Sequence, residues 1–321
     1  MRKTNSSLGK SGKKDVGIKY AAMYTIYIGA ILSLLTYDIR VRVEAMNHEY
    51  NRRRYIRVQR LINISMAEAY RTTSSEALCT VTATIPLIIQ IEEIVIRYNT
   101  KNRKSKSLVE LDHEVEYKYW PHSADVVRFA EVEGDEEATL LAFTDGRKHE
   151  IGVGAGAVVF KGSEFVAKVQ EKLDNRCSNN QAEQLAILKV LETIELMKSH
   201  INTPRTVTII TDSRVSLDSL QNPNNHAHLV QAIKKKVTSM VRDKWKIKFS
   251  WVKVHVRIFG NEIADRLDKE TSRSEETNYV FSRIPVSAIY REAAEEERLK
   301  WQEKLKKKNT KQRQRNSIFQ Q

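Results

Sequence analysis

The pattern of apolar and polar residues predicts strands and helices in a defined order over residues 136–273. Short apolar or alternating stretches predict five strands, at residues 138–143, 152–160, 164–170, 206–211 and 247–254. Apolar residues at helical spacing predict three helices, one beginning near Ser178 and two over residues 229–242 and 260–271. Ser178 and Gln181 resemble a capping box at the first of these helices. This order predicts an α/β fold with a mixed five-stranded sheet flanked by helices.

The residues before this region have a different pattern, which is mainly α-helical from about residue 20 to residue 98. A polar, basic break at residues 101–106 separates the two halves. We therefore predict a helical segment at residues 1–100, a linker at 101–135, an α/β domain at 136–273 and a charged helical tail at 274–321.

One apolar stretch, residues 20–37, has eighteen positions without a charged side chain and follows a cluster of lysines. That length is close to the shortest that spans a bilayer, so a signal anchor is one alternative. Against a membrane span, the stretch contains the hydroxyl-bearing residues Thr25, Ser33 and Thr36 and four tyrosines. We therefore expect a helix that packs on protein, and we expect no membrane insertion.

Four carboxylates lie in four separate short motifs. They are Asp145 in Phe-Thr-Asp-Gly, Glu183 in Ser-Asn-Asn-Gln-Ala-Glu, Asp212 in Ile-Ile-Thr-Asp-Ser and Asp265 in Gly-Asn-Glu-Ile-Ala-Asp. Each lies at the end of a predicted element, and ligands bind at the carboxyl ends of parallel strands. Four hard oxygen donors can hold two divalent cations about 4 Å apart, as in enzymes that cleave phosphodiesters. The set therefore predicts a two-metal nuclease site, and magnesium suits its oxygen ligands.

Each motif also has an ordinary structural interpretation. Thr-Asp-Gly alone is usually a turn, because Asp and Gly are common turn residues. Glu183 alone could be a first-turn acid favoured by the helix dipole. The joint occurrence of the four acids in this element order favours the nuclease site. We interpret three further acids, Asp218, Glu262 and Asp268, as solvated.

With these motifs in this order, residues 136–273 resemble a type 1 ribonuclease H domain. The resemblance implies a ribonuclease H-like fold and hydrolysis of the RNA strand of RNA–DNA hybrids. It implies two Mg²⁺ ions, with Mn²⁺ as a substitute, and no small-molecule cofactor. By this resemblance Asp145 would bridge both ions, Glu183 and Asp212 would complete one shell, and Asp265 would hold the ion that carries the attacking water.

The same resemblance assigns roles beside the carboxylates. His255, ten residues before Asp265, matches the mobile histidine that assists turnover. Asn179 and Asn180 match positions that contact the RNA strand, where a 2′-OH distinguishes RNA from DNA. The predicted nucleic-acid contacts are completed by Ser213, Arg147 and Arg257. Two of these depart from the family pattern, because Arg147 replaces a small Ser and Arg257 replaces a Gly, and either arginine could slow turnover or bind a phosphate.

The upstream half carries a second resemblance. Residues 27–37, 54–63 and 69–78 resemble the region that follows the reverse transcriptase palm in arthropod non-LTR retrotransposons, where ribonuclease H lies directly downstream. The sequence contains no Tyr-x-Asp-Asp polymerase motif. We therefore predict a truncated retroelement copy with a remnant of the reverse transcriptase before the nuclease.

Composition agrees with a nucleic-acid partner. The formal net charge is +14 at pH 7, which favours polyanions, and the tail from Lys304 to Arg315 is expected to add phosphate contacts. Two cysteines are too few for a disulfide framework or a cysteine zinc site, so we expect a soluble protein of the nucleus or cytoplasm. The leading alternative function is a catalytically inactive, nucleic-acid-binding remnant, and a membrane-anchored fragment is the third.

Overall fold

The computed structural model describes residues 20–37, 43–102, 111–120, 138–200, 205–252, 259–274 and 278–318. The chain divides into two compact units. Residues 1–102 with 292–321 form a helical unit, and residues 103–291 form an α/β unit. The final helix, α10 (Val286–Ile318), begins in the α/β unit and continues in the helical unit.

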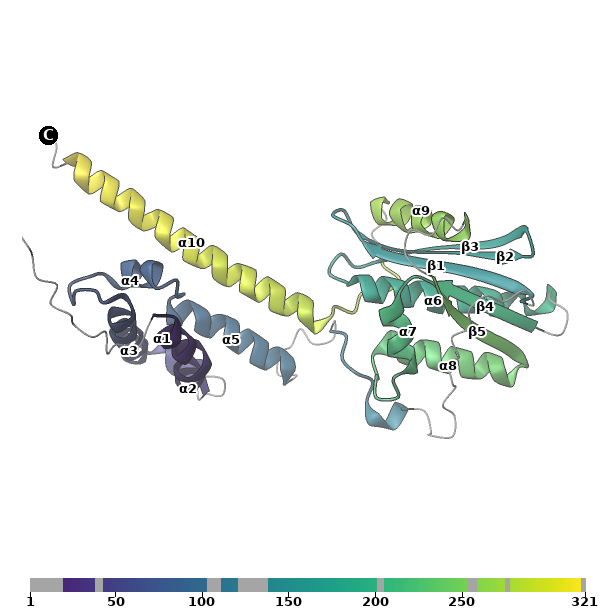
Figure 1. Cartoon of the computed structure of the whole chain (residues 1–321), viewed down its shortest axis with the longest axis horizontal. Coiled ribbons are helices and arrows are strands. Elements are labelled where there is room, and N and C mark those ends of the chain that lie inside the picture. Colours follow the sequence, from purple (N-terminus) through teal and green to yellow (C-terminus); the bar gives the residue numbers. More distant parts are fainter. Residues whose placement is uncertain are drawn as a thin grey trace, which may run out of the picture. The chain divides into compact units, whose positions relative to one another are not determined.

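The α/β unit contains the predicted mixed sheet of five strands. These are β1 (Leu140–Lys148), β2 (Val153–Lys161), β3 (Glu164–Leu173), β4 (Arg205–Thr211) and β5 (Trp245–Trp251). Their order across the sheet is β3-β2-β1-β4-β5 (Figure 1). The first three strands form an antiparallel meander, and β1, β4 and β5 are parallel. The predicted fold class is confirmed.

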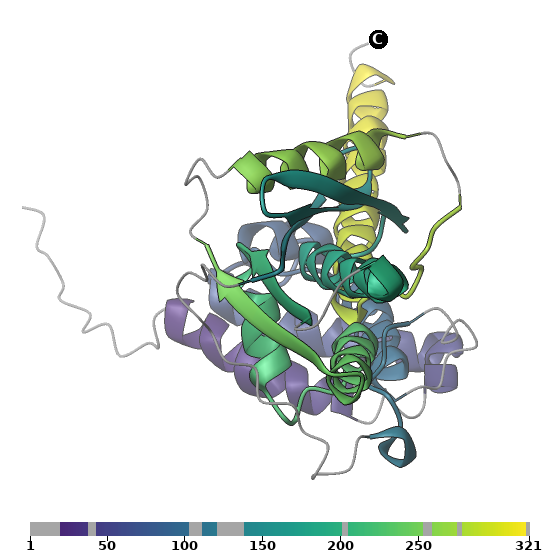
Figure 2. The ribbon, with the colours of Figure 1, turned by 90° about the vertical axis from the view of Figure 1, so that its right-hand side faces the viewer.

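Helices cover both faces of this sheet (Figure 2). One face carries α6 (Asn179–Leu196), α7 (Arg214–Gln221) and α8 (His228–Arg242), and the other carries α9 (Phe259–Arg273). The predicted capping box of Ser178 and Gln181 begins α6. The short helix α7 was not among the predicted elements. Ser213 caps it by accepting a hydrogen bond from the backbone N–H of Ser216 (3.3 Å).

Strand β1 is longer than the alternation of its apolar residues predicts. Its pairing with β2 continues to Lys148, which lies opposite Val153, so Asp145 lies inside the strand. Its parallel pairing with β4 ends earlier, at Thr144 opposite Thr211. Pairing with β2 therefore extends β1 beyond the point where its pairing with β4 ends. The apolar pattern of β1 alone does not predict this extension.

Glycines on β2 let α9 lie directly on the sheet. Gly154 and Gly156 alternate along β2 and so share one face, and Gly152 directly precedes the strand. A Cβ at Gly154 would lie 2.2 Å from the carbonyl oxygen of Asp268, and one at Gly156 would lie 2.5 Å from that of Ala264. Any side chain at these positions would push α9 away from β2.

Described residues of the predicted linker also belong to the α/β unit. Leu111 forms a strand bridge with Ile284. Asp112 Oδ2 accepts a hydrogen bond from Gln181 Nε2 (2.6 Å), so the segment is attached beside the first turn of α6.

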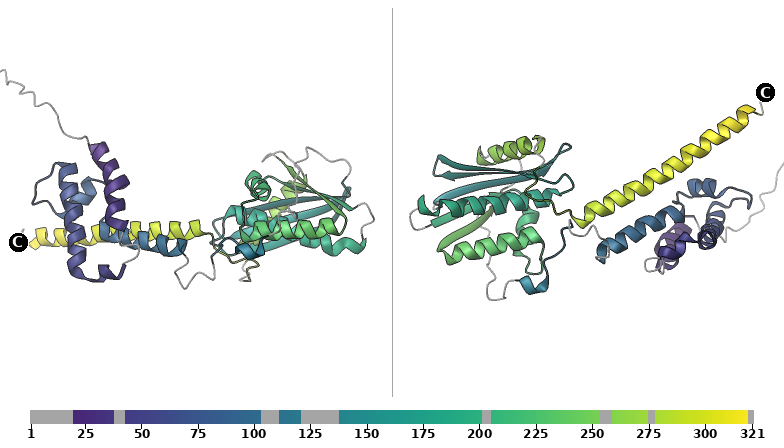
Figure 3. Two further views of the ribbon diagram at one scale, coloured as in Figure 1. Left: turned by 90° about the horizontal axis from the view of Figure 1, so that it is seen from below. Right: turned by 180° about the vertical axis from the view of Figure 1, so that it is seen from behind.

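The helical unit contains the predicted helix at residues 20–37, built from α1 (Tyr20–Ile26), a π-helical turn (Tyr27–Ile31) and α2 (Leu32–Tyr37). It continues through a 3-10 turn (Val43–Asn47), α3 (Glu49–Ala67), α4 (Ser75–Val81) and α5 (Leu87–Lys101) to the later part of α10 (Figure 3). Its apolar core is small and centres on Leu32, Leu87 and Ile91.

The apolar helix at residues 20–37 packs on its neighbours along a narrow strip. Tyr27, Leu32 and Thr36 are buried, whereas Leu34 is 76% exposed and Tyr37 is 77% exposed. Among the described residues, this is the one helix with the length and composition to cross a membrane. Several of its apolar side chains are exposed.

Candidate active site

The adjacent parallel strands β1 and β4 bring two of the predicted acids, Asp145 and Asp212, together. Thr144 of β1 lies opposite Thr211 of β4, and Asp145 and Asp212 each follow directly. The side chain of Trp251, at the end of β5, donates a hydrogen bond from Nε1 to the backbone oxygen of Asp212 (3.1 Å). The sheet backbone therefore fixes the spacing of the two aspartates.

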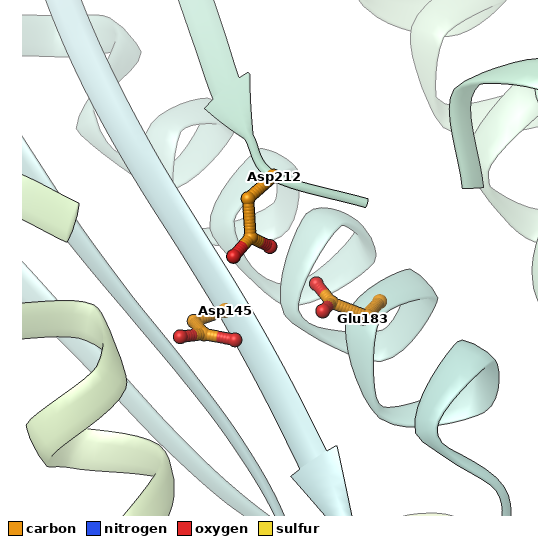
Figure 4. A group of neighbouring side chains, drawn as sticks. All are labelled: Asp145, Glu183 and Asp212. Atoms are coloured by element: carbon orange, nitrogen blue, oxygen red, sulfur yellow. The ribbon is translucent and has the colours of Figure 1, made fainter. Parts of the chain in front are cut away.

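Close packing of α6 on β1 adds the third acid. A Cβ at Gly146 would lie 2.3 Å from the carbonyl carbon of Ala182 and 2.4 Å from the backbone nitrogen of Glu183. Glycine in the Thr-Asp-Gly motif is therefore required by backbone contact with the first turn of α6. The side chains of Asp145, Glu183 and Asp212 point toward one another (Figure 4), and one carboxylate oxygen from each lies within 4.8 Å of the others.

Helix α9 brings two more acids to Asp145. Carboxylate oxygens of Asp145, Asp265 and Asp268 form a second group, also within 4.8 Å of one another. Asp145 belongs to both groups, so the four predicted acids converge as the motifs indicated. The interpretation of Asp268 as a solvated acid was wrong, because its side chain is fully buried. Asp218 and Glu262 are exposed.

Burial and mutual repulsion make these acids resist ionisation. Burial, followed by the charges of Asp212, Asp268 and Asp265, raises the pKa of Asp145 to about 7. Burial is also the main reason that the pKa of Glu183 is raised well above its usual value. The pKa of Asp268 is raised to about 7 by burial and by Asp265. A nearby cation would stabilise the ionised carboxylates.

The donor set fits divalent cations. Glu183 Oε2 and Asp268 Oδ1 are buried and have no hydrogen-bond partner in the described part of the chain. Unpaired buried carboxylate oxygens are costly in a protein interior, and a hard cation prefers oxygen ligands of this kind. Asp145, Glu183, Asp212, Asp265 and Asp268 could therefore hold such ions.

The other predicted site residues lie around this cluster with varied local roles. Asn179 Oδ1 accepts a hydrogen bond from the backbone N–H of Lys148 (2.8 Å), which fastens α6 to β1. Asn180 and Arg147 are exposed. Ser213 caps α7. The predicted positions of His255 and Arg257 lie outside the described residues.

Sequence reasoning missed one neighbour of the cluster as well as Asp268. His149 Nε2 lies 3.3 Å from Asp268 Oδ2. Burial lowers the pKa of His149, as do the charges of Arg147 and Lys269. The alternating glycines of β2 are the sequence signal that could have predicted a buried face on α9 and therefore a buried Asp268.

One family model matches the part of the chain that carries these acids. Residues 137–273 match the family model for RNase H. Solved structures also match, among them the N-terminal RNase H domain of Rv2228c from Mycobacterium tuberculosis, studied as a fusion with maltose-binding protein. It is 18% identical, with a TM-score of 0.33, and the match covers 41% of this chain and 98% of that chain. No curated protein matches the chain.

Proposed function

We propose that residues 137–273 hydrolyse the RNA strand of RNA–DNA hybrids with two divalent cations, Mg²⁺ or Mn²⁺. The observation that carries this proposal is the convergence of Asp145, Glu183, Asp212 and Asp265 from four separate elements, within a segment that matches the RNase H family. Buried carboxylate oxygens without partners support a role in cation binding rather than in stability.

Each acid has a distinct part in the proposed reaction. Asp145 belongs to both carboxylate groups and would be the shared ligand, with Glu183 and Asp212 on one side and Asp265 on the other. Divalent cations held there would neutralise charge on the scissile phosphate and lower the pKa of the attacking water. The four carboxylates would hold the cations in a fixed position, because β1, α6, β4 and α9 fix the backbone of each acid.

Nucleic-acid contacts are assigned to residues around the acids. Asn180, and the amide nitrogen of Asn179, lie at the start of α6 and would contact the RNA strand near its 2′-OH groups. Arg147, which is exposed on β1, would contact a phosphate, and Ser213 lies directly after Asp212. His255 and Arg257 keep their proposed roles in turnover and in phosphate binding. The basic tail would add sequence-independent phosphate contacts.

The helical unit is proposed to be a remnant of a reverse transcriptase from a non-LTR retroelement. Its resemblance to the region after the polymerase palm supports this origin, as does its position directly before the nuclease segment. A small core with exposed apolar residues on the helix at 20–37 agrees with the loss of a larger partner. We propose that the protein acts in the nucleus or cytoplasm, where hybrids are available.

The test compares three duplexes of one sequence with the full chain: RNA–DNA hybrid, DNA duplex and RNA duplex, each with Mg²⁺ or Mn²⁺. We expect cleavage of the RNA strand of the hybrid alone. Glu183→Gln, which removes a charge with little change of shape, is the inactive control. If the wild type binds the hybrid and cleaves none of the duplexes, the protein is the inactive binding remnant. Arg147→Ser with Arg257→Gly then tests whether the two arginines block the reaction.

A further inference from the structure

Asp268 occupies a position in the cluster that its sequence pattern did not predict. Gly156 lies opposite Asp145 in the β1–β2 register, and a Cβ at Gly156 would lie 2.7 Å from the backbone nitrogen of Asp268. The glycine therefore places the backbone of Asp268 against the strand pair that carries Asp145. This packing brings a fifth carboxylate to within 4.8 Å of both Asp145 and Asp265.

The two carboxylate oxygens of Asp268 have different surroundings. Oδ2 lies 3.3 Å from His149 Nε2 and can accept a hydrogen bond from that ring. Oδ1 is buried and has no hydrogen-bond partner among the described residues, although the side chain is fully inaccessible to solvent. If Asp268 served only to pair with His149, its second oxygen would stay unpaired. An unsatisfied buried polar atom costs about 1–3 kcal/mol, so a ligand for this oxygen is expected.

The basic side chains nearest to Asp145, Asp265 and Asp268 do not prevent a cation from binding there. Asp265 Oδ2 contacts Lys269 Nζ, which is one turn further along α9 and 41% exposed, so this lysine can swing toward solvent. Arg147 is also exposed. Asp145 and Asp268 each have a deeply buried carboxylate.

We propose that Asp145, Asp265 and Asp268 together bind one divalent cation before any substrate is present, with His149 as a positioning residue that holds Asp268. This inference rests on the proposed function and deepens it by adding a metal-binding residue. Magnesium is usually held by one or two carboxylates plus substrate phosphates. Three protein carboxylates remove the need for a phosphate. A hydrogen bond from His149 fixes the orientation of Asp268, as outer residues commonly do for metal-binding carboxylates.

The test measures Mn²⁺ binding to the full chain without nucleic acid, by equilibrium dialysis and by electron paramagnetic resonance of free Mn²⁺. We expect two bound ions in the wild type. Asp268→Asn keeps the shape of the side chain and should weaken one of the two sites at least about 10-fold, leaving the other unchanged. His149→Gln should weaken the same site by a smaller factor. Asp218→Asn, an exposed acid of α7, is the matched control and should change neither site.

Three outcomes overturn the proposal. These are a wild type that binds no ion without nucleic acid, an Asp268→Asn variant that binds every ion with wild-type affinity, and an Asp218→Asn variant that loses a site equally. Asp268→Ala is measured in parallel, and circular dichroism identifies any variant that does not fold. Hybrid cleavage separates this inference from the proposed function. Ion binding that depends on Asp268 without cleavage would refute the function alone. Cleavage by a protein whose ion binding does not depend on Asp268 would refute the inference alone.

Discussion

The helical unit buries an amide with a full set of hydrogen-bond partners, whereas the α/β unit buries a cluster of acids. In the helical unit, the buried Gln59 amide has hydrogen-bond partners for both its nitrogen and its oxygen. In the α/β unit, Glu183 and Asp268 are acids that each leave one buried oxygen without a described partner. The first arrangement replaces apolar packing in a small core. The unpaired acid oxygens lower the stability of the metal-free fold, and a bound cation would offset this cost.

The apolar cores differ in the same direction. The α/β unit has clusters on both faces of its sheet, built from side chains that are almost fully inaccessible. A large core can tolerate several kcal/mol of unfavourable buried charge, whereas a small one cannot. The comparison teaches that the cluster of acids lies in the unit with the larger apolar core. The four predictions below test this contrast, from the largest expected effect to the smallest.

Replacing one buried acid in each unit should separate function from structure. Asp145→Asn should lower Mg²⁺-dependent hybrid cleavage by at least about 10³-fold, because Asp145 belongs to both carboxylate groups. Glu93→Gln, at a buried acid of α5 that is paired with Arg97, should leave cleavage unchanged. Single-turnover assays with the full chain provide the measurement. Equal losses in the two variants would show that the contrast between the units is false.

The stability of the metal-free α/β unit should fall as the pH rises toward 7. The folded-state pKa of Asp145 is about 7, against 3.8 for the free side chain, so the folded state holds a proton that the unfolded state releases between these values. The stabilisation is complete below about pH 4 and is lost as the pH rises through 7, by roughly 4 kcal/mol at most.

Urea denaturation in EDTA measures this dependence. Trp301 of the helical unit is replaced by Phe, so that the remaining tryptophans, Trp120, Trp245 and Trp251, report on the α/β unit. Asp145→Asn in the same background should flatten the slope between pH 4 and pH 7. A slope that is unchanged in this variant would exclude Asp145 as its source.

Removal of Gln59 should destabilise the helical unit alone. Its Nε2 donates to the Tyr27 hydroxyl (3.0 Å) and to the Ile85 carbonyl (2.7 Å), and its Oε1 accepts from the Leu87 N–H (2.7 Å). Gln59→Ala leaves these groups unpaired and should cost about 3 kcal/mol. Hydrogen–deuterium exchange should show lost protection in α3 and α5 and none in β1 and β4. Arg57→Ala, on the exposed side of α3, is the control and should change neither unit.

Alanine at glycine should have opposite signs in the two units. At Gly156 the added Cβ would meet backbone atoms of α9 at 2.5 and 2.7 Å, so Gly156→Ala should destabilise the α/β unit by about 2 kcal/mol. At Gly29, in the helix at residues 20–37, an added Cβ would meet no atom of another part of the chain within 4 Å. Gly29→Ala should therefore stabilise that helix by about 1 kcal/mol. Urea midpoints of the two units measure both effects, and matching signs would contradict the proposed packing of α9.

Sequence by itself determined the features that depend on neighbours in the chain. Alternation and helical spacing predicted the five strands and the main helices, and Ser178 with Gln181 predicted the start of α6, because capping is a local interaction. The four acidic motifs predicted which carboxylates converge. Each motif contains both its acid and the residues that shape the local turn or strand end.

Tertiary structure decided what depends on contacts between distant segments. The hairpin with β2 extended β1 beyond Asp145, and the backbone of α6 filled the space that Gly146 leaves open. The spacing along α9 places Asp268 on the same face as Ala264 and Leu267, but how deeply an acid on that face is buried depends on what packs against it. Its burial follows from glycines on β2 that lie more than a hundred residues earlier and let the helix approach the strand. The elements packed against an acid determine its burial, and therefore its pKa and its function. These properties could not be predicted from the segment that carries the acid.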